Sequence, residues 1–204
     1  MSTTDVPPKP NRNWGWGDRL TRFFRIGKIL PFIRHGERVV DIGCGQSNAV
    51  MAAVESRGGS YVGVDPLVEK EGMRGAAEFV RHIVGDGGRI PLPDTSFDVA
   101  ISLAVLEHVD DPLGLIAEKF RLLKPGGRLI LTTPTRFAKP VLEALVVLHI
   151  INKQEIAEHK HYFNRAELRD LVTRAGFSDF KHETWQLLMN QLVTAKKPPV
   201  GTGQ

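Results

Sequence analysis

A β-branched run followed by two glycines, at residues 39–45, constrains the fold of this chain more than any other stretch. Val39 and Val40 lead through Asp41 into a Gly-Cys-Gly sequence. Beyond the glycines, apolar residues recur at helical spacing: Ala49, Val50, Ala53 and Val54. This change of period predicts a buried strand, a tight turn and a helix.

The two glycines of this turn, Gly43 and Gly45, remove side chains where the backbone must approach a ligand or adopt a positive φ. The helix that follows would present unpaired N–H groups and the positive end of its dipole. Such a turn forms nucleotide or nucleoside sites at the carboxyl end of a parallel strand. The turn alone is a weak signal, because a dinucleotide fingerprint has a third glycine where this chain has Asn48. A turn without a ligand is the alternative.

Strands and helices are predicted to alternate along most of the chain. After the first strand, strands are expected at 60–64, 82–85, 97–102 and 128–133, and helices at 46–57, 66–80, 112–123 and 165–175. A break near Gly72 and Gly75 is the alternative for the helix at 66–80. Two last strands, at 177–184 and 186–195, are close enough in sequence to form an antiparallel hairpin. Strands alternating with helices predict an α/β fold, with a parallel sheet covered on both faces.

A length of 204 residues fits one domain. We expect a disordered tail at 1–17, a single domain at 18–197 with a helical insertion at about 135–163, and a second disordered tail at 198–204. The net charge of +4 suits an anionic ligand but is too small for a nucleic-acid footprint. The single cysteine, Cys44, excludes an internal disulfide and fits a reducing, cytoplasmic compartment.

Two apolar segments indicate further contacts. A predicted helix at 19–34 has apolar residues on one half of its circumference and basic residues on the other, and Pro31 should bend or end it. The segment 141–151 is apolar on nearly every side but is about half the length of a membrane span. It must therefore be buried against the domain, another subunit, a lipid or a ligand. A monomer or a homodimer, and a peripheral contact with the cytoplasmic side of a membrane, remain open.

Acidic residues follow the second and third predicted strands. Asp65 comes 22 residues after Gly43, where a carboxylate can accept hydrogen bonds from two ribose hydroxyls. Asp86 ends the third strand, where an adenine amino group can be bound. Because the carboxyl ends of parallel strands meet at one edge, these residues should surround one crevice. A bare Asp41 carboxylate inside an apolar strand would be costly. It is expected to accept from turn N–H groups, to orient a cationic amino group through water, or only to hold the loop.

Five motifs follow one another along the chain. They are Val39-Val-Asp-Ile-Gly-Cys-Gly45, Tyr61-Val-Gly-Val-Asp65, Gly85-Asp86 with Leu92-Pro-Asp94-x-x-Phe97-Asp98, Ser102-x-x-Val-Leu-Glu-His-Val109-x-Asp-Pro112, and Arg121-x-Leu-Lys-Pro-Gly-Gly127. Together they resemble the motifs of the class I S-adenosylmethionine-dependent methyltransferases, and the resemblance extends from about Glu37 to Lys196. The closing His161-Tyr-Phe-Asn-Arg-x-Glu-Leu168 resembles the branch of that family with small-molecule and lipid substrates.

The resemblance implies a Rossmann-like, doubly wound sheet of seven strands, mostly parallel with the last strand antiparallel. It also implies S-adenosyl-L-methionine as cofactor. Its binding residues would be Gly43, Cys44 and Gly45 under the methionine part, Asp65 on the ribose, Asp86 and Gly87 near the adenine, and Leu103 beside the methyl sulfonium, with Asp41 and Pro66 in the same set.

The implied reaction is an in-line displacement, in which an O, N or C nucleophile of a small or lipid-linked acceptor attacks the methyl carbon. An O or N nucleophile can require a base, and the candidates are His108, His159 and His161, because histidine titrates near neutrality. A structural hydrogen bond for His108 and a solvated turn for the other two are the alternatives. No metal site is expected, since no Cys or carboxylate cluster has ligand spacing.

Three other functions compete with methyl transfer. A nicotinamide dehydrogenase would also begin with a glycine turn, but it lacks the Leu-Lys-Pro-Gly-Gly turn and has a third glycine. Aminopropyl transfer would place an acidic pair after the fourth strand, where this chain has Ser102-Leu-Ala-Val105. A catalytically silent cofactor-binding module that docks a partner keeps the same glycines and acids, so only an assay can separate it. Base-methylating motifs are missing after the fourth strand, so nucleic acid is not expected as a substrate.

Overall fold

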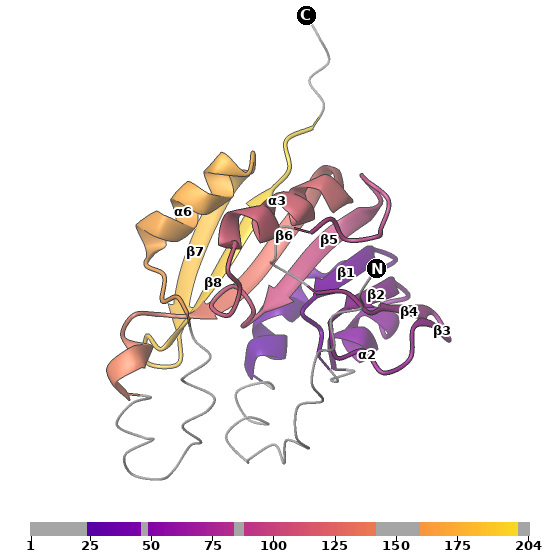
Figure 1. Cartoon of the computed structure of the whole chain (residues 1–204), viewed down its shortest axis with the longest axis horizontal. Helices are drawn as coiled ribbons and strands as arrows, with labels where there is room; N and C mark the ends of the chain where they lie inside the picture. Colours follow the sequence, from indigo (N-terminus) through magenta and orange to yellow (C-terminus); the bar gives the residue numbers. More distant parts are fainter. Residues whose placement is uncertain (1–23, 46–48, 84–87, 142–159, 200–204) are drawn as a thin grey trace, which may run out of the picture.

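A computed structural model of the chain describes residues 24–45, 49–83, 88–141 and 160–199. One sheet of eight strands, in the order β3-β4-β2-β1-β5-β6-β8-β7, passes through the molecule (Figure 1). The strands are β1 (Arg38–Ile42), β2 (Ser60–Val64), β3 (Gly72–Arg74), β4 (Ala77–Val80), β5 (Phe97–Leu103), β6 (Leu123–Pro134), β7 (Ser178–Trp185) and β8 (Asn190–Lys196). The helices are α2 (Ala49–Glu55), α3 (Pro112–Leu122) and α6 (Arg165–Arg174), preceded by a helical segment at 24–29 and a 3₁₀ turn, η1 (Leu30–Phe32).

The sheet confirms the predicted fold class. Strands β4, β2, β1, β5 and β6 pair in parallel, whereas β8 runs antiparallel to both β6 and β7. The last strand is therefore antiparallel, and the last two strands form the expected hairpin. The sheet has eight strands instead of seven, because a short edge strand, β3, pairs antiparallel with β4.

The prediction of a helix at 66–80 is wrong, and so is the position of the third strand at 82–85. Residues 72–80 form the β3–β4 hairpin, in which Arg74 pairs with Ala77 across a two-residue loop. Gly75 occupies the first loop position with φ +65°, a conformation typical of glycine in tight hairpins. A second positive φ, +101° at Gly72, also excludes a regular helix here. The third parallel strand thus ends at Val80.

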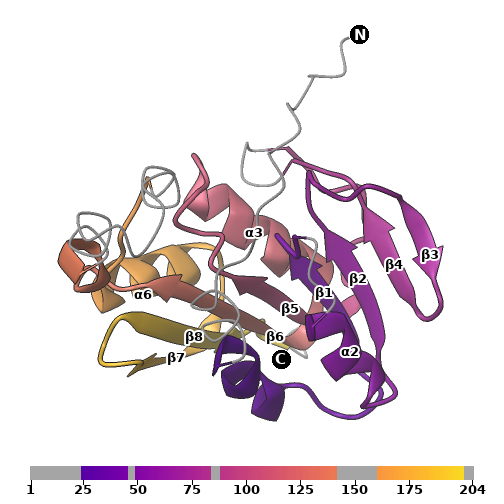
Figure 2. The same cartoon turned by 90° about the horizontal axis from the view of Figure 1, so that it is seen from below.

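Helices cover both faces of the sheet (Figure 2). On one face lie α3 and α6, and on the other lie α2 and the helical segment at 24–32. Each face has its own apolar core, the first around Ile116 and Leu168 and the second around Ile29 and Val54. Asp111 caps α3 by accepting from the Gly114 N–H at 2.8 Å, which fixes the position at which α3 begins.

Several predictions fall on residues outside the described ranges. They include the N-terminal tail, most of the insertion at 135–163 and of its apolar segment 141–151, and the part of the first helix before residue 24. The domain boundaries therefore stay predictions. Among the described residues, no helix is long and apolar enough to cross a bilayer.

Candidate functional site

The glycine turn connects the carboxyl end of β1 with that of β2 and with the loop after β5. The Gly43 and Cys44 N–H groups donate to the Val64 carbonyl oxygen at 2.7 and 3.3 Å. Gly43 has φ +82°, and a Cβ atom there would lie 2.2 Å from a methyl carbon of Val105. Any larger residue would therefore push the turn away from the β5 loop. Gly45, with φ +60°, has open space where its Cβ would be, which leaves the backbone accessible.

The carboxylate of Asp65 bridges the ends of β1 and β2. One of its oxygens accepts from the Gly45 N–H at 2.8 Å, and the other accepts from the Leu67 N–H at 2.8 Å. The side chain is buried, with 7% of the residue exposed. Each oxygen keeps a second lone pair for a further donor. Asp65 thus orders the glycine turn and presents acceptor capacity at the same edge, next to Pro66.

Asp41 is a buried carboxylate directly below the glycine turn. The Tyr61 hydroxyl donates to one of its oxygens at 3.0 Å. The other oxygen is buried and has no hydrogen-bond partner among the described residues. Burial raises the pKa of Asp41 to about 7, and the hydrogen bond from Tyr61 opposes that rise. An unpaired buried oxygen is costly, so this position favours a donor that is not part of the described chain.

Cys44 is a packing residue in this structure. It is 8% exposed and belongs to the core on the α2 face. Burial, together with the negative charges of Asp41 and Asp65, raises the pKa of the Cys44 thiol above its usual range. A thiol held in its neutral form does not act as a nucleophile at neutral pH.

A second buried carboxylate, Glu107, lies beyond β5 and was missed from the sequence. The Thr133 hydroxyl on β6 donates to it at 3.0 Å, and only 1% of Glu107 is exposed. Burial raises its pKa, although His108, Arg25 and the Thr133 hydrogen bond act in the opposite direction. Its sequence signal was a carboxylate close to the apolar Leu106 and Val109.

Of the three candidate histidines, the structure places two near Glu107. The His108 N–H donates to the Val105 carbonyl at 2.9 Å, and the Lys160 and His161 N–H groups donate to the Glu107 carbonyl at 2.8 and 3.2 Å. These bonds tie the segment after the insertion to the β5–α3 connection. Leu103, at the end of β5, is partly exposed at the same edge of the sheet. His159, Asp86 and Gly87 lie outside the described residues.

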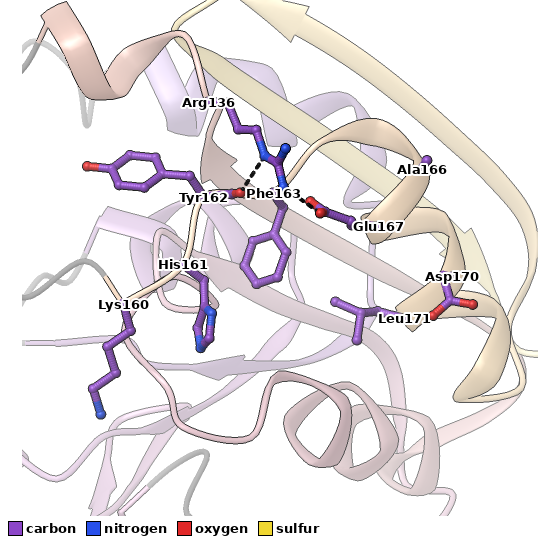
Figure 3. A pocket seen from close by; sticks show the side chains of 9 residues that line it. All are labelled: Arg136, Lys160, His161, Tyr162, Phe163, Ala166, Glu167, Asp170 and Leu171. Carbon is purple, nitrogen blue, oxygen red and sulfur yellow. Dashed lines mark hydrogen bonds and ion pairs between the residues drawn. The ribbon is translucent and has the colours of Figure 1, made fainter.

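An open groove of about 610 Å³ lies beside this segment, between residues 160–163 and α6 (Figure 3). We call it the α6 groove. His161, Tyr162 and Phe163 line one side of it, and Arg136 crosses it to bond the Tyr162 carbonyl at 3.1 Å and the Glu167 carboxylate at 2.5 Å. The α6 groove therefore places aromatic rings and a paired guanidinium next to His161. No group of three His, Cys, Asp or Glu side chains in the described ranges is arranged to hold a metal.

Comparison with known proteins gives consistent matches. A family model described as a methyltransferase domain matches residues 12–182. The ubiquinone biosynthesis O-methyltransferase of Pseudomonas fluorescens strain Pf0-1 is 31% identical over 182 residues, covering 80% of this chain and 78% of the relative.

Solved structures show the same fold. A complex between the Haloferax volcanii Trm112 methyltransferase activator and a methyltransferase matches with a TM-score of 0.69 and 19% identity, covering 87% of this chain and 91% of that one. A SAM-dependent methyltransferase from Archaeoglobus fulgidus matches with a TM-score of 0.66 and 18% identity, covering 88% and 94%.

Proposed function

This chain belongs to the methyltransferase domain family and is a class I S-adenosylmethionine-dependent methyltransferase, and we propose that its acceptor is a small molecule with an apolar or lipid-linked portion. The observation that carries the site assignment is the convergence of the glycine turn, Asp65 and Asp41 at one edge of the sheet. The O-methyltransferase relatives favour an oxygen nucleophile over nitrogen or carbon.

The residues at this edge fit the cofactor. Asp65 would accept from the ribose hydroxyls with the lone pairs that Gly45 and Leu67 leave unused. The orphaned oxygen of Asp41 would face the cationic amino group of the methionine part, directly or through water. Gly43, Cys44 and Gly45 would lie beneath the methionine part, and Leu103 and Pro66 would flank the cofactor. In this proposal Asp86 and Gly87 would lie near the adenine, as the resemblance implies.

When bound, S-adenosylmethionine supplies an electrophilic methyl group on a sulfonium, so the protein has to position the reactants and exclude water. The acceptor would enter from the corner formed by His108, His161 and the α6 groove. A histidine there would take the proton of an attacking hydroxyl. The buried Glu107 would position His161, because the backbone carbonyl of Glu107 accepts from the N–H groups of residues 160 and 161.

His161→Ala is expected to lower kcat by about 100-fold or more if this imidazole is the base, because general-base catalysis contributes about 10²–10⁴-fold. Affinity for S-adenosylhomocysteine should not change. Steady-state kinetics and calorimetry measure the two effects. His182→Ala is a matched control, because this imidazole bonds Gln191 on β8. Full activity in the double variant His108→Ala/His161→Ala would show that neither histidine is the base. His159 would then be the remaining candidate, or the reaction would need no base.

The decisive experiment combines binding and transfer. Calorimetry with S-adenosylhomocysteine should show saturable binding at one site. Transfer of a labelled methyl group should then be screened over phenolic small molecules and over lipid extracts. Failure to bind would remove the cofactor site, whereas binding without any transfer would favour a silent module that docks a partner. In this proposal the enzyme is cytoplasmic, a monomer or a homodimer, and acts on no nucleic acid.

A further inference from the structure

The segment that follows β6 lies next to the turn between β7 and β8 (Figures 1 and 2), and both carry large exposed apolar residues. We define the apolar corner as Phe137, Val141, Leu187 and Leu188, whose exposed fractions are 71%, 42%, 96% and 54%. Single exposed apolar residues are ordinary on protein surfaces, but a cluster of large ones marks a contact site.

The backbone of the β7–β8 turn is built to hold its leucines outward. Gln186, Leu187 and Leu188 all have a positive φ, of 52°, 53° and 68°. This conformation is unfavourable for residues other than glycine, and it persists only where the surroundings enforce it. Thr135 enforces it here, because its N–H donates to the Met189 carbonyl at 2.9 Å and its hydroxyl donates to the Leu188 carbonyl at 2.5 Å. These hydrogen bonds therefore hold the β7–β8 turn in one conformation and connect it to the segment that carries Phe137.

Two basic residues accompany the apolar corner, and one of them, Arg136, is paired with Glu167 of α6. Residues 132–141 and 184–190 contain Arg136 and Lys139 but no Asp or Glu. Lys139 lies 6.0 Å from the ring centre of Tyr162 and makes no ion pair within the described ranges. Arg136 directly precedes Phe137 of the apolar corner, and it also lines the α6 groove. Apolar side chains flanked by basic ones are typical of surfaces that bind anionic lipid.

We propose that the apolar corner docks on the surface of an anionic lipid bilayer, with Leu187 and Leu188 below the headgroups and Lys139 among them. A two-fold contact between copies of this chain fits less well, because the same patch would meet itself and bring its basic residues together. The inference deepens the proposed function and rests on it in one respect: a lipid-linked acceptor would reach the α6 groove from the bilayer at this corner.

Vesicle sedimentation tests the proposal without cofactor or acceptor. The full chain should bind vesicles of phosphatidylglycerol and phosphatidylcholine in equal parts, bind pure phosphatidylcholine vesicles far less, and lose binding as salt rises. The double variant Leu187→Ser/Leu188→Ser should lower the partition coefficient at least about tenfold, and Lys139→Glu should weaken binding to the anionic vesicles. Met73→Ser, at an exposed apolar residue on β3, is the matched control and should bind as the wild type does.

A second measurement places the turn relative to the lipid. Leu187→Trp should show fluorescence that brominated lipids quench, as expected for a side chain below the headgroups. Equal vesicle binding by the wild type and the double serine variant would overturn the proposal, as would a wild-type dimer that the double variant dissociates without any vesicle binding. If vesicle binding fails while methyl transfer to a soluble acceptor proceeds, only this inference is lost. If vesicles bind and S-adenosylhomocysteine does not, only the proposed enzyme site is lost.

Discussion

Replacing Asp65 with alanine should weaken S-adenosylhomocysteine binding by about 1.5–3 kcal/mol, which is about 10- to 150-fold in the dissociation constant. Hydrogen bonds to a charged group have this magnitude, and in our proposal the Asp65 carboxylate accepts from the ribose. The variant also loses the acceptor of the Gly45 and Leu67 N–H groups. The glycine turn would then be less ordered, so the upper end of the range is expected. Titration calorimetry on the folded variant measures the loss.

Asp98→Ala is the control for the structural part of this effect. Asp98 is also a carboxylate that accepts from a backbone N–H, that of Arg38 at 2.9 Å, and it pairs with Lys124. It lies at the amino end of β5, away from the proposed site. Both variants should lower the free energy of unfolding, but only Asp65→Ala should lower the affinity. An unchanged affinity in Asp65→Ala would remove this residue from the cofactor site.

The parts of the fold that short-range patterns determine were predictable. The first strand and its glycine turn follow from a β-branched run and two glycines, and the structure has both features there. Helix α6 begins at Arg165, as predicted, because the side chains of Asn164 and Glu167 form a reciprocal cap before it. In each case the residues that decide the structure lie within a few positions of one another.

The region between β2 and β5 was mispredicted because its structure depends on partners far away in sequence. Pro66 and the following apolar and charged residues fit a helix, yet β4 pairs with β2, and β3 extends the sheet beyond it. Glu107 was missed for a similar reason. Its burial depends on Thr133 of β6 and on the returning segment at 160–161, and no local pattern in the sequence brings these residues together.

Lys119 shows a further consequence of long-range packing. It lies on the buried stripe of α3 with Leu115, Ile116 and Leu122, and 1% of it is exposed. Burial lowers the pKa of Lys119 to about 7, and the negative charge of Asp41 opposes that shift. Asp41, whose pKa burial raises to about 7, faces Tyr61 on the other side of the sheet. Asp41 and Lys119 are therefore two ionisable groups of the core whose charged forms are destabilised by desolvation.

These two groups predict a minimum in the free energy of unfolding near pH 7. For Asp41 the folded pKa of about 7 exceeds the ordinary 3.8, so the native state binds the extra proton between these values and stability falls as pH rises through them. For Lys119 the folded pKa of about 7 lies below the ordinary 10.5, so the unfolded state binds the extra proton above pH 7. Stability then rises with pH from 7 to about 9, above which the raised pKa of the Cys44 thiol opposes a further rise.

Lys119→Met should remove the rising limb and stabilise the protein by about 1–4 kcal/mol below pH 7, where the lysine is charged and Asp41 is neutral. Methionine keeps an apolar stem of similar length, so the packing of α3 is retained. Urea unfolding over a pH series measures both effects. The exposed Lys181→Met should change stability by no more than about 0.5 kcal/mol at any pH. If Lys119→Met destabilises the protein throughout, the buried ammonium is held by stronger interactions than the attraction of Asp41. In Lys119→Met, the remaining fall of stability with rising pH should come from Asp41 and from Glu107, whose pKa burial also raises, so Asp41→Asn should reduce this slope.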